Sequence, residues 1–203
     1  MVVLTLMIAA AAIWSAWIFQ GQLTQAQKQF EVADRPWISV DVSVFSPLAY
    51  DSNGIHMTFK IVPKNIGHSP AQSIWIQPTL VIATMGDDLR TVEERTCQQA
   101  IAENQASEVP WAKYTLFPGD SYVQNTGVGV PIESINSKWE RFDLIPIALV
   151  GCVDYIFGPA SRHHQTGFIY EVLMRDGRIP SKSKAPIAPE LLGLRPMGGQ
   201  FAN

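Results

Sequence analysis

The chain has 203 residues, of which 47% are hydrophobic and 16% charged, and its formal net charge is −3. A typical soluble domain carries roughly 25% charged residues, so the chain has an apolar excess, which is concentrated near its N-terminus. Because its lysines and arginines form no cluster or stripe, the composition argues against a nucleic-acid-binding protein, and we expect no nucleic-acid partner.

Residues 2–19 form an uncharged stretch, VVLTLMIAAAAIWSAWIF. As a helix this stretch spans about 27 Å, close to the thickness of the hydrocarbon core of a bilayer. Trp14 and Trp17 lie near one end of it, where amphipathic rings favour the membrane interface. The alternatives are a buried helix of a soluble domain and a cleaved signal peptide, although the basic segment of such peptides is missing. We predict a single-pass transmembrane helix over residues 1–20, with membrane lipid as its partner.

The helix is expected to continue as a stalk over residues 21–35, because the residue before Pro36 avoids the α conformation. An apolar stripe with alternating spacings of three and four residues runs along both parts, as in a coiled-coil seam. Its members are Ala9, Ala12, Ala16, Phe19, Leu23, Ala26, Phe30 and Ala33. Small residues in such a stripe allow close approach of helices in lipid. The stripe predicts self-association or contact with a partner's helix; the alternative is chance, or packing on the chain's own domain.

Residues 36–175 read as a β domain, because apolar and polar residues alternate in several segments. The segments expected to form strands are 37–45, 55–62, 72–84, 113–130, 144–157 and 163–174. Residues 87–106 interrupt this pattern with an amphipathic helix, and a short helix is expected over 131–142. Residues 176–203 read as a linker containing proline and lysine, followed by an apolar-leaning tail.

Six or seven short strands with turn signals predict a β-sandwich. The loop residues Asn65, Gly67, Pro70 and Ala71, followed by FPGDS (117–121), resemble those of bacterial immunoglobulin-like modules. The order of four further segments after the predicted anchor is similar to that in a group of uncharacterised single-pass membrane proteins from proteobacteria. These segments are RPW (35–37), NIGHSPA (65–71), GCVDY (151–155) and HHQTGFIY (163–170). The resemblance implies a mainly β chain, an immunoglobulin-like β-sandwich with an inserted amphipathic helix on an N-terminal transmembrane helix, and no assigned activity.

Residues 151–172, GCVDYIFGPASRHHQTGFIYEV, are expected to form a hairpin with residues 158–162 as its loop. This register pairs Asp154 with Thr166 and Cys152 with Phe168, which leaves Cys152 and His164 roughly 13 Å apart. That separation is too large for a nucleophile and its base.

Neighbouring His163 and His164 point to opposite faces of a strand, so they cannot readily bind one ion together. We therefore expect no catalytic residue, no metal and no cofactor. Asp154, His164 and Thr166 would instead be neighbours on one face, where they form a hydrogen-bonded cluster and a candidate ligand site.

Cys97 lies on the apolar face of the inserted helix, which has to pack on the sandwich. A disulfide between Cys97 and Cys152 is expected, with two buried free thiols as the alternative. Lys28 and Arg35 follow the predicted anchor and weakly favour a cytoplasmic domain. A disulfide would outweigh that preference, because disulfides persist in oxidising compartments, so we expect the domain to be periplasmic.

These patterns together predict a non-enzymatic interaction module tethered to the bacterial inner membrane. It would be an accessory subunit of a membrane complex or a self-associating protein that makes contact through the N-terminal helix. The alternative is a membrane-tethered sensor of a small ligand, with its cleft near Asp154, His164 and Thr166.

Overall fold

A computed structural model of the chain describes residues 2–83, 88–107, 113–139, 141–158 and 162–198. Two compact units make up the chain: Met1–Arg35 and Pro36–Asn203.

The first unit contains one long helix, α1 (Val2–Ala33), which ends shortly before Pro36 as predicted. All side chains of residues 12–26 are exposed. Within the described residues, no helix is both long and apolar enough to qualify as a membrane span. The side chains of residues 1–11, more than half of the predicted span, lie outside the described part.

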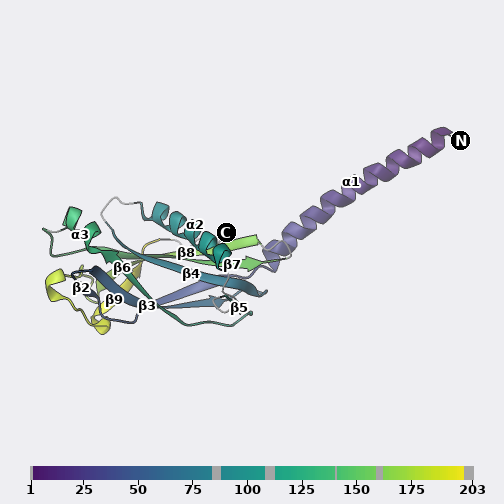
Figure 1. The fold of residues 1–203 in the computed structure, drawn as a ribbon. Helices are drawn as coiled ribbons and strands as arrows, with labels where there is room; N and C mark the ends of the chain where they lie inside the picture. Colours follow the sequence, from purple (N-terminus) through teal and green to yellow (C-terminus); the bar gives the residue numbers. More distant parts are fainter. Residues whose placement is uncertain (1, 84–87, 108–112, 140, 159–161, 199–203) are drawn as a thin grey trace. The chain divides into compact units, whose positions relative to one another are not determined.

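The second unit is mainly β and contains two antiparallel sheets (Figure 1). In the first sheet, β1 (Ile38–Val44) and β2 (Ala49–Asp51) pair with the long central strand β3 (Gly54–Asn65). The strand β6 (Gln124–Pro131) also pairs with β3. The apolar positions of β3 at Ile55, Met57, Phe59 and Ile61 are buried, as their alternation predicts.

The second sheet has the order β5-β4-β7-β8-β9. Its strands are β5 (Tyr114–Leu116), β4 (Ala71–Ile82), β7 (Ile147–Phe157), β8 (Arg162–Met174) and β9 (Leu192–Pro196). The segment 113–130, expected as one strand, is divided between the sheets: its first part is β5 and its second part is β6. Gly119, in the turn between them, has a φ of 88°, a conformation that favours glycine.

Side chains from both sheets meet in one hydrophobic core, which includes Phe59 of β3, Tyr155 of β7 and Phe168 of β8. The other face of the second sheet is covered by α2 (Leu89–Ala106), which is seen running along β4, β7 and β8 in Figure 1. Every residue of β7 from Ile147 to Tyr155 is therefore buried, because the strand lies between the core and a helix. A short helix, α3 (Ile132–Trp139), follows Pro131 as predicted.

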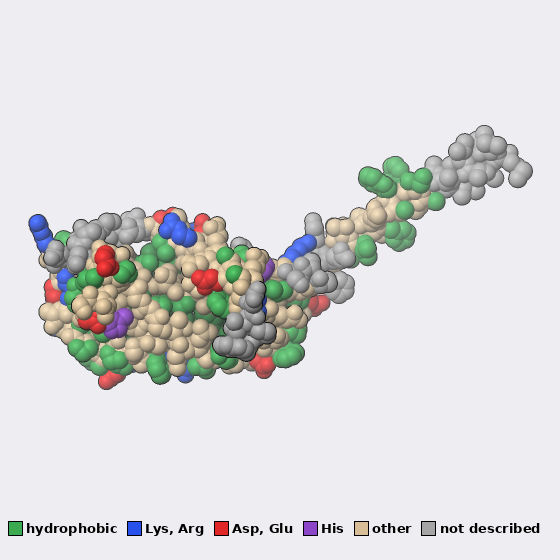
Figure 2. All heavy atoms as spheres, viewed as in Figure 1, with side chains coloured by type: hydrophobic (Ala, Val, Ile, Leu, Met, Phe, Trp, Pro, Cys, Tyr) green, Lys and Arg blue, Asp and Glu red, His purple; other side chains and the backbone are tan. Residues whose placement is uncertain are grey.

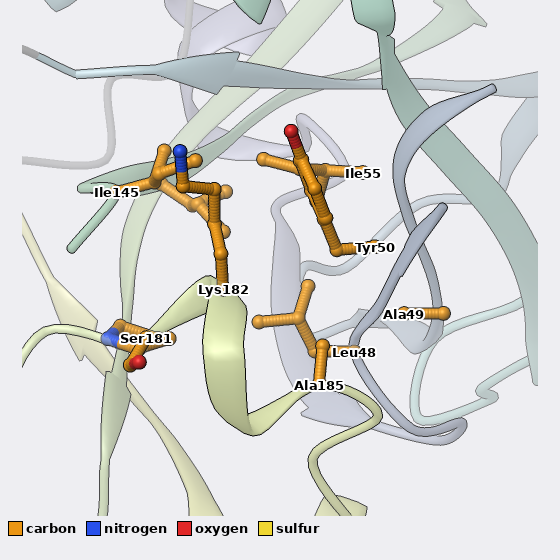
Figure 3. Close-up of a pocket in the computed structure, with 10 residues that line it drawn as sticks. Leu48, Ala49, Tyr50, Ile55, Ile145, Ser181, Lys182 and Ala185 are labelled. Atoms are coloured by element: carbon orange, nitrogen blue, oxygen red, sulfur yellow. The ribbon is translucent and has the colours of Figure 1, made fainter. Parts of the chain in front are cut away.

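The expected linker over residues 176–190 is instead part of the β domain. Ile187 is buried, and its backbone exchanges hydrogen bonds of 2.9 Å with Leu48. The backbone amide of Ser183 donates to Asp143, and Lys182 covers the ring of Tyr50 beside a recess of about 10 Å³ (Figure 3). The segment then continues into β9, so the buried side chain of Ile187 and hydrogen bonds to Leu48 and Asp143 hold this proline-containing segment on the domain.

Candidate functional site

The register of the β7–β8 hairpin differs by one residue from the predicted one. Asp154 pairs with Gln165, Cys152 with Gly167, and the last pair before the loop is Phe157 with Arg162. The predicted loop was one residue too long. Because side chains alternate between the two faces of a strand, a shift of one residue changes which residues of β8 share a face with Asp154.

The expected ligand cluster of Asp154, His164 and Thr166 is therefore not assembled. Asp154 lies on the face covered by α2, where it contacts Asn104 of that helix. His164 stacks on the ring of Tyr155 with centroids 5.8 Å apart, and Thr166 pairs with Val153 of the core. His163, which the predicted register had placed on the other face, is the histidine that meets Asp154.

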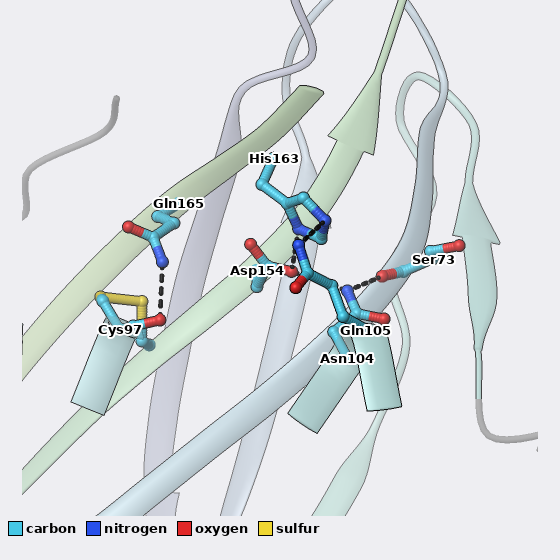
Figure 4. Close-up of polar contacts among 8 residues, drawn as sticks. Ser73, Cys97, Asn104, Gln105, Asp154, His163 and Gln165 are labelled. Carbon is cyan, nitrogen blue, oxygen red and sulfur yellow. Dashed lines mark hydrogen bonds and ion pairs between the residues drawn. A yellow bond between two sulfur atoms is a disulfide. The ribbon is translucent and has the colours of Figure 1, made fainter. Parts of the chain in front are cut away.

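Asp154 is the centre of a buried polar cluster beneath α2 (Figure 4). Its Oδ2 atom accepts a hydrogen bond of 2.7 Å from the side-chain amide of Asn104 and lies 2.8 Å from Nδ1 of His163. An ionised carboxylate can only accept, so in that state Nδ1 of His163 carries the proton. The Nδ2 atom of Asn104 also donates to the carbonyl of Ser73 in β4, at 2.7 Å. The cluster thus joins one helix to three strands of the sheet.

Burial raises the pKa of Asp154, and the hydrogen bonds from Asn104 and His163 act in the opposite direction. Its side chain is 0% exposed, and Oδ1 has no hydrogen-bond partner among the described residues. The Nε2 atom of His163 lies 3.3 Å from the side-chain amide of Gln105. Oδ2 of Asp154 is thus occupied by its contacts with Asn104 and His163, and the contact with Asn104 helps to hold α2 on the sheet.

Cys97 of α2 and Cys152 of β7 form a disulfide, with their Cα atoms 5.1 Å apart. Both cysteines are buried and pack with Ala100 and the ring of Trp75. The side-chain amide of Gln165 donates to the carbonyl of Cys97 at 2.7 Å, beside the disulfide. Helix α2 is therefore attached to the sheet by one covalent bond, by a hydrogen bond at Cys97 and by those of Asn104 further along the helix.

Glu93 is a buried acid on the same face of α2 that the sequence reasoning missed. It is 1% exposed, and its Oε1 atom has no hydrogen-bond partner among the described residues. Burial raises the pKa of Glu93 to about 7. The charge of Arg90 lowers this pKa and that of Glu94 raises it, both by less than burial does. A helical spacing signal was available, because Glu93 is four residues before Cys97 and seven before Ala100.

The buried side chain of Asn65 holds the loop formed by the NIGHSPA segment (65–71) in place. It is 0% exposed, and its side-chain amide donates to the carbonyls of Ser69 and Leu116 at 2.8 and 2.9 Å. Its Oδ1 atom accepts from the backbone amide of Gly67 at 3.0 Å. One buried side chain thus fixes two loops at one end of the domain.

The chemistry available in this cluster is limited. The cysteine nearest to the Asp154–His163 pair is already in the disulfide, so it offers no thiolate. Within the described ranges, no group of three or more His, Cys, Asp or Glu residues is placed to hold a metal ion. Figure 2 shows the charged side chains of the β domain scattered over the visible face rather than gathered on it.

The fold and the cluster define a class of protein: a two-sheet antiparallel β domain with a helix fixed to one sheet by a disulfide. The chain belongs to the family described as "Domain of unknown function (DUF8453)", whose model matches residues 1–143. The match thus covers α1 through α3 and ends before β7, which carries Cys152 and Asp154.

The chain is also similar to a "Protocadherin-like wing polarity protein stan" of Drosophila melanogaster, with 27% identity over 158 residues. That alignment covers 77% of this chain but only 4% of the fly protein. No solved structure matches the chain.

Proposed function

We propose that this chain is a membrane-anchored, non-enzymatic interaction module of the bacterial inner membrane, with an immunoglobulin-like domain in the periplasm. It would act as an accessory subunit of a membrane complex or by self-association. The observation that carries the proposal is the apolar surface of α1, where Trp14, Trp17, Phe19 and Leu23 are 73%, 78%, 70% and 63% exposed. An isolated helix that exposes such side chains to water is poorly stabilised, so lipid or another helix has to cover them.

Two different parts of α1 support the two parts of this proposal. The uncharged residues 2–19 have the length and composition that a bilayer requires. The apolar stripe continues beyond them through Leu23 and Ala26, in a segment otherwise rich in glutamine, and both residues are exposed. Ala12 and Ala16 of the stripe are exposed as well, whereas the side chain of Phe30 lies outside the described residues.

The disulfide supports the periplasmic side, because such bonds are rare in reducing compartments. We would label membranes with a mass-adding maleimide under denaturing conditions, with and without prior reduction. If both thiols react only after reduction and the protein migrates as a monomer, the periplasmic placement stands. If both react without reduction in freshly prepared membranes, the domain faces the cytoplasm and this part of the proposal is wrong.

The association role is tested by placing a carboxylate in the stripe beyond the uncharged stretch. Leu23→Glu should weaken self-association or partner binding roughly tenfold or more, because an unpaired charge is costly to bury between helices. Gln25→Glu is the matched control, because two residues along a helix turn the new charge by about 200° to the opposite face.

The measurement is the size of the full chain on native gels and by chemical cross-linking in membranes. An unchanged oligomer in Leu23→Glu would refute the association role, and so would an equal loss in both variants. The ligand-sensor alternative lacks specific support, because Oδ2 of Asp154 is engaged by Asn104 and His163 beneath α2.

A further inference from the structure

Five exposed apolar side chains gather at one end of the β domain, and we call them the apolar rim. They are Trp37 (41% exposed), Ile66 (61%), Phe117 (58%), Tyr122 (43%) and Val123 (50%). These residues come from three separate segments: the start of β1, the loop after β3, and the loop between β5 and β6. At about 200 Å² for a large side chain, the rim exposes on the order of 500 Å² of mostly apolar surface. A patch of that size on a monomer is often an interaction site.

Backbone hydrogen bonds connect the three segments. The amide of Ile66 donates to the carbonyl of Trp37 at 2.7 Å, and the amide of Tyr122 donates to Pro63 at 3.2 Å. Asn65 exchanges backbone bonds with the loop that contains Phe117: it donates to Asp120 at 3.0 Å and accepts from Gly119 at 2.8 Å. The rim is therefore held in an outward-facing arrangement by the same buried asparagine that fixes the NIGHSPA loop.

The chain enters the domain at this end, because Trp37 directly follows Pro36, the first residue of the unit. Residues 20–33 of α1 and the three residues that follow it connect the uncharged stretch to Trp37, and together they reach at most about 30 Å. Gly21 lies in this connection, where a helix bends at lower cost than at other residues. An anchor in the membrane would thus keep the rim close to the lipid surface, at a high effective concentration.

The composition of the rim also matches a lipid interface better than a hydrocarbon core. Trp37 and Tyr122 have amphipathic rings of the kind enriched at membrane interfaces, and Phe117 and Ile66 supply apolar depth. Lys64, near the end of β3, and Asp120, in the loop between β5 and β6, are both exposed charged residues near the rim. Because these two charges are opposite, the match to a lipid interface rests on the aromatic and apolar side chains of the rim.

We propose that the apolar rim inserts into the headgroup region of the membrane that anchors the chain. This inference rests on the proposed membrane anchor. It adds a second lipid contact, made by the β domain itself, which would limit the domain's orientation relative to the bilayer.

The test uses the full chain in vesicles of phosphatidylcholine with a minority of phosphatidylglycerol. Because the chain's two cysteines are in a disulfide, a cysteine introduced by Phe117→Cys is the only free thiol and can carry a nitroxide. Phe45→Cys is the matched control: Phe45 is 56% exposed against 58% for Phe117, and it follows the opposite end of β1. Ile66→Cys is a second rim position that guards against a local effect of either label.

Collision with oxygen, which concentrates in lipid, is compared with collision with a water-soluble nickel chelate. We expect the rim labels to meet the chelate roughly threefold less often than the label at position 45, and to meet oxygen more often. Equal chelate accessibility at both ends would overturn the proposal. Shielding from both reagents at the rim would also overturn it, because it would indicate a protein contact.

The two proposals fail in different ways. If alkaline extraction removes the chain from the vesicles, the anchor fails. If the chain stays in the vesicles and the rim labels remain in water, the anchor stands and only the rim proposal fails.

Discussion

Replacing the buried acid of α2 with its neutral amide, Glu93→Gln, should remove a specific part of the protein's pH dependence. Glu93 is 1% exposed, and its pKa is raised from 4.5 to about 7, chiefly by burial. An unfolded chain would ionise this carboxyl near its ordinary pKa, whereas the folded chain keeps it protonated until the pH approaches 7.

The sign follows from proton binding. Between pH 4.5 and 7 the folded state holds a proton that the unfolded state has lost, so stability falls by about 1.4 kcal/mol for each pH unit. The stabilisation is complete below pH 4.5, and about 3 kcal/mol of it is lost by the time the pH has risen through 7. Glutamine does not titrate, so the variant should match the wild type near pH 4. It should be more stable at pH 8, by up to about 3 kcal/mol.

The assay is urea unfolding of the full chain in detergent at several pH values from 4 to 8, followed by circular dichroism. Glu94→Gln is the matched control, because Glu94 is the neighbouring acid on the same helix and is exposed. Between pH 5 and 7, we expect the control to keep the wild-type dependence of the unfolding free energy on pH. In Glu93→Gln that slope should change by the contribution of about one proton, which is about 1.4 kcal/mol per pH unit. An unchanged slope in Glu93→Gln would show that the burial argument is wrong.

Two further predictions concern β7 and its contacts. Cys97→Ala with Cys152→Ala opens a link with a sequence separation of 55, so the free energy of unfolding measured in urea should fall by roughly 4 kcal/mol; a loss below about 1 kcal/mol would contradict the chain-entropy estimate. Gly151→Ala would place a Cβ in overlap with three ring carbons of the buried Phe168, so it should cost about 1–3 kcal/mol in the same assay. Gly127→Ala is its control, because the nearest atom to a Cβ there is 3.8 Å away and the change should stay within about 0.5 kcal/mol. Equal effects of the two alanines would remove the steric explanation.

The parts of the fold that the sequence predicted well are those with one covered face. In β3 the apolar residues from Ile55 to Ile61 alternate with exposed or half-buried ones, so a period of two identifies the inner face. In α2 the buried residues Cys97 and Ala100 follow the helical period, which placed Cys97 toward the sheet. Both patterns arise because water covers the opposite face.

Elements that depend on distant partners were predicted less well. Residues 113–130 read as one strand, but an alternating pattern does not indicate which sheet a strand joins. The turn at Gly119 takes the chain from one sheet to the other. The strand β9 is short and follows a proline-rich segment, so its pairing with β8 had no local signal. Glu93 was missed because acids on a helix are usually expected to face solvent.

The candidate site was misassigned because the strand that carries it has no exposed face. From Ile147 to Tyr155, β7 is buried on both sides, so its composition does not distinguish the core face from the face under α2. The register then depended on the loop, and one residue too many in the loop exchanged His163 with His164 as the neighbour of Asp154. The orientation of Cys97, in contrast, could be predicted without the β7–β8 register, because it depends only on which face of α2 is apolar. The disulfide could therefore be expected from helical spacing and the count of two cysteines, with free thiols as the alternative, whereas the Asp154–His163 contact requires knowing which face of a doubly buried strand the helix covers.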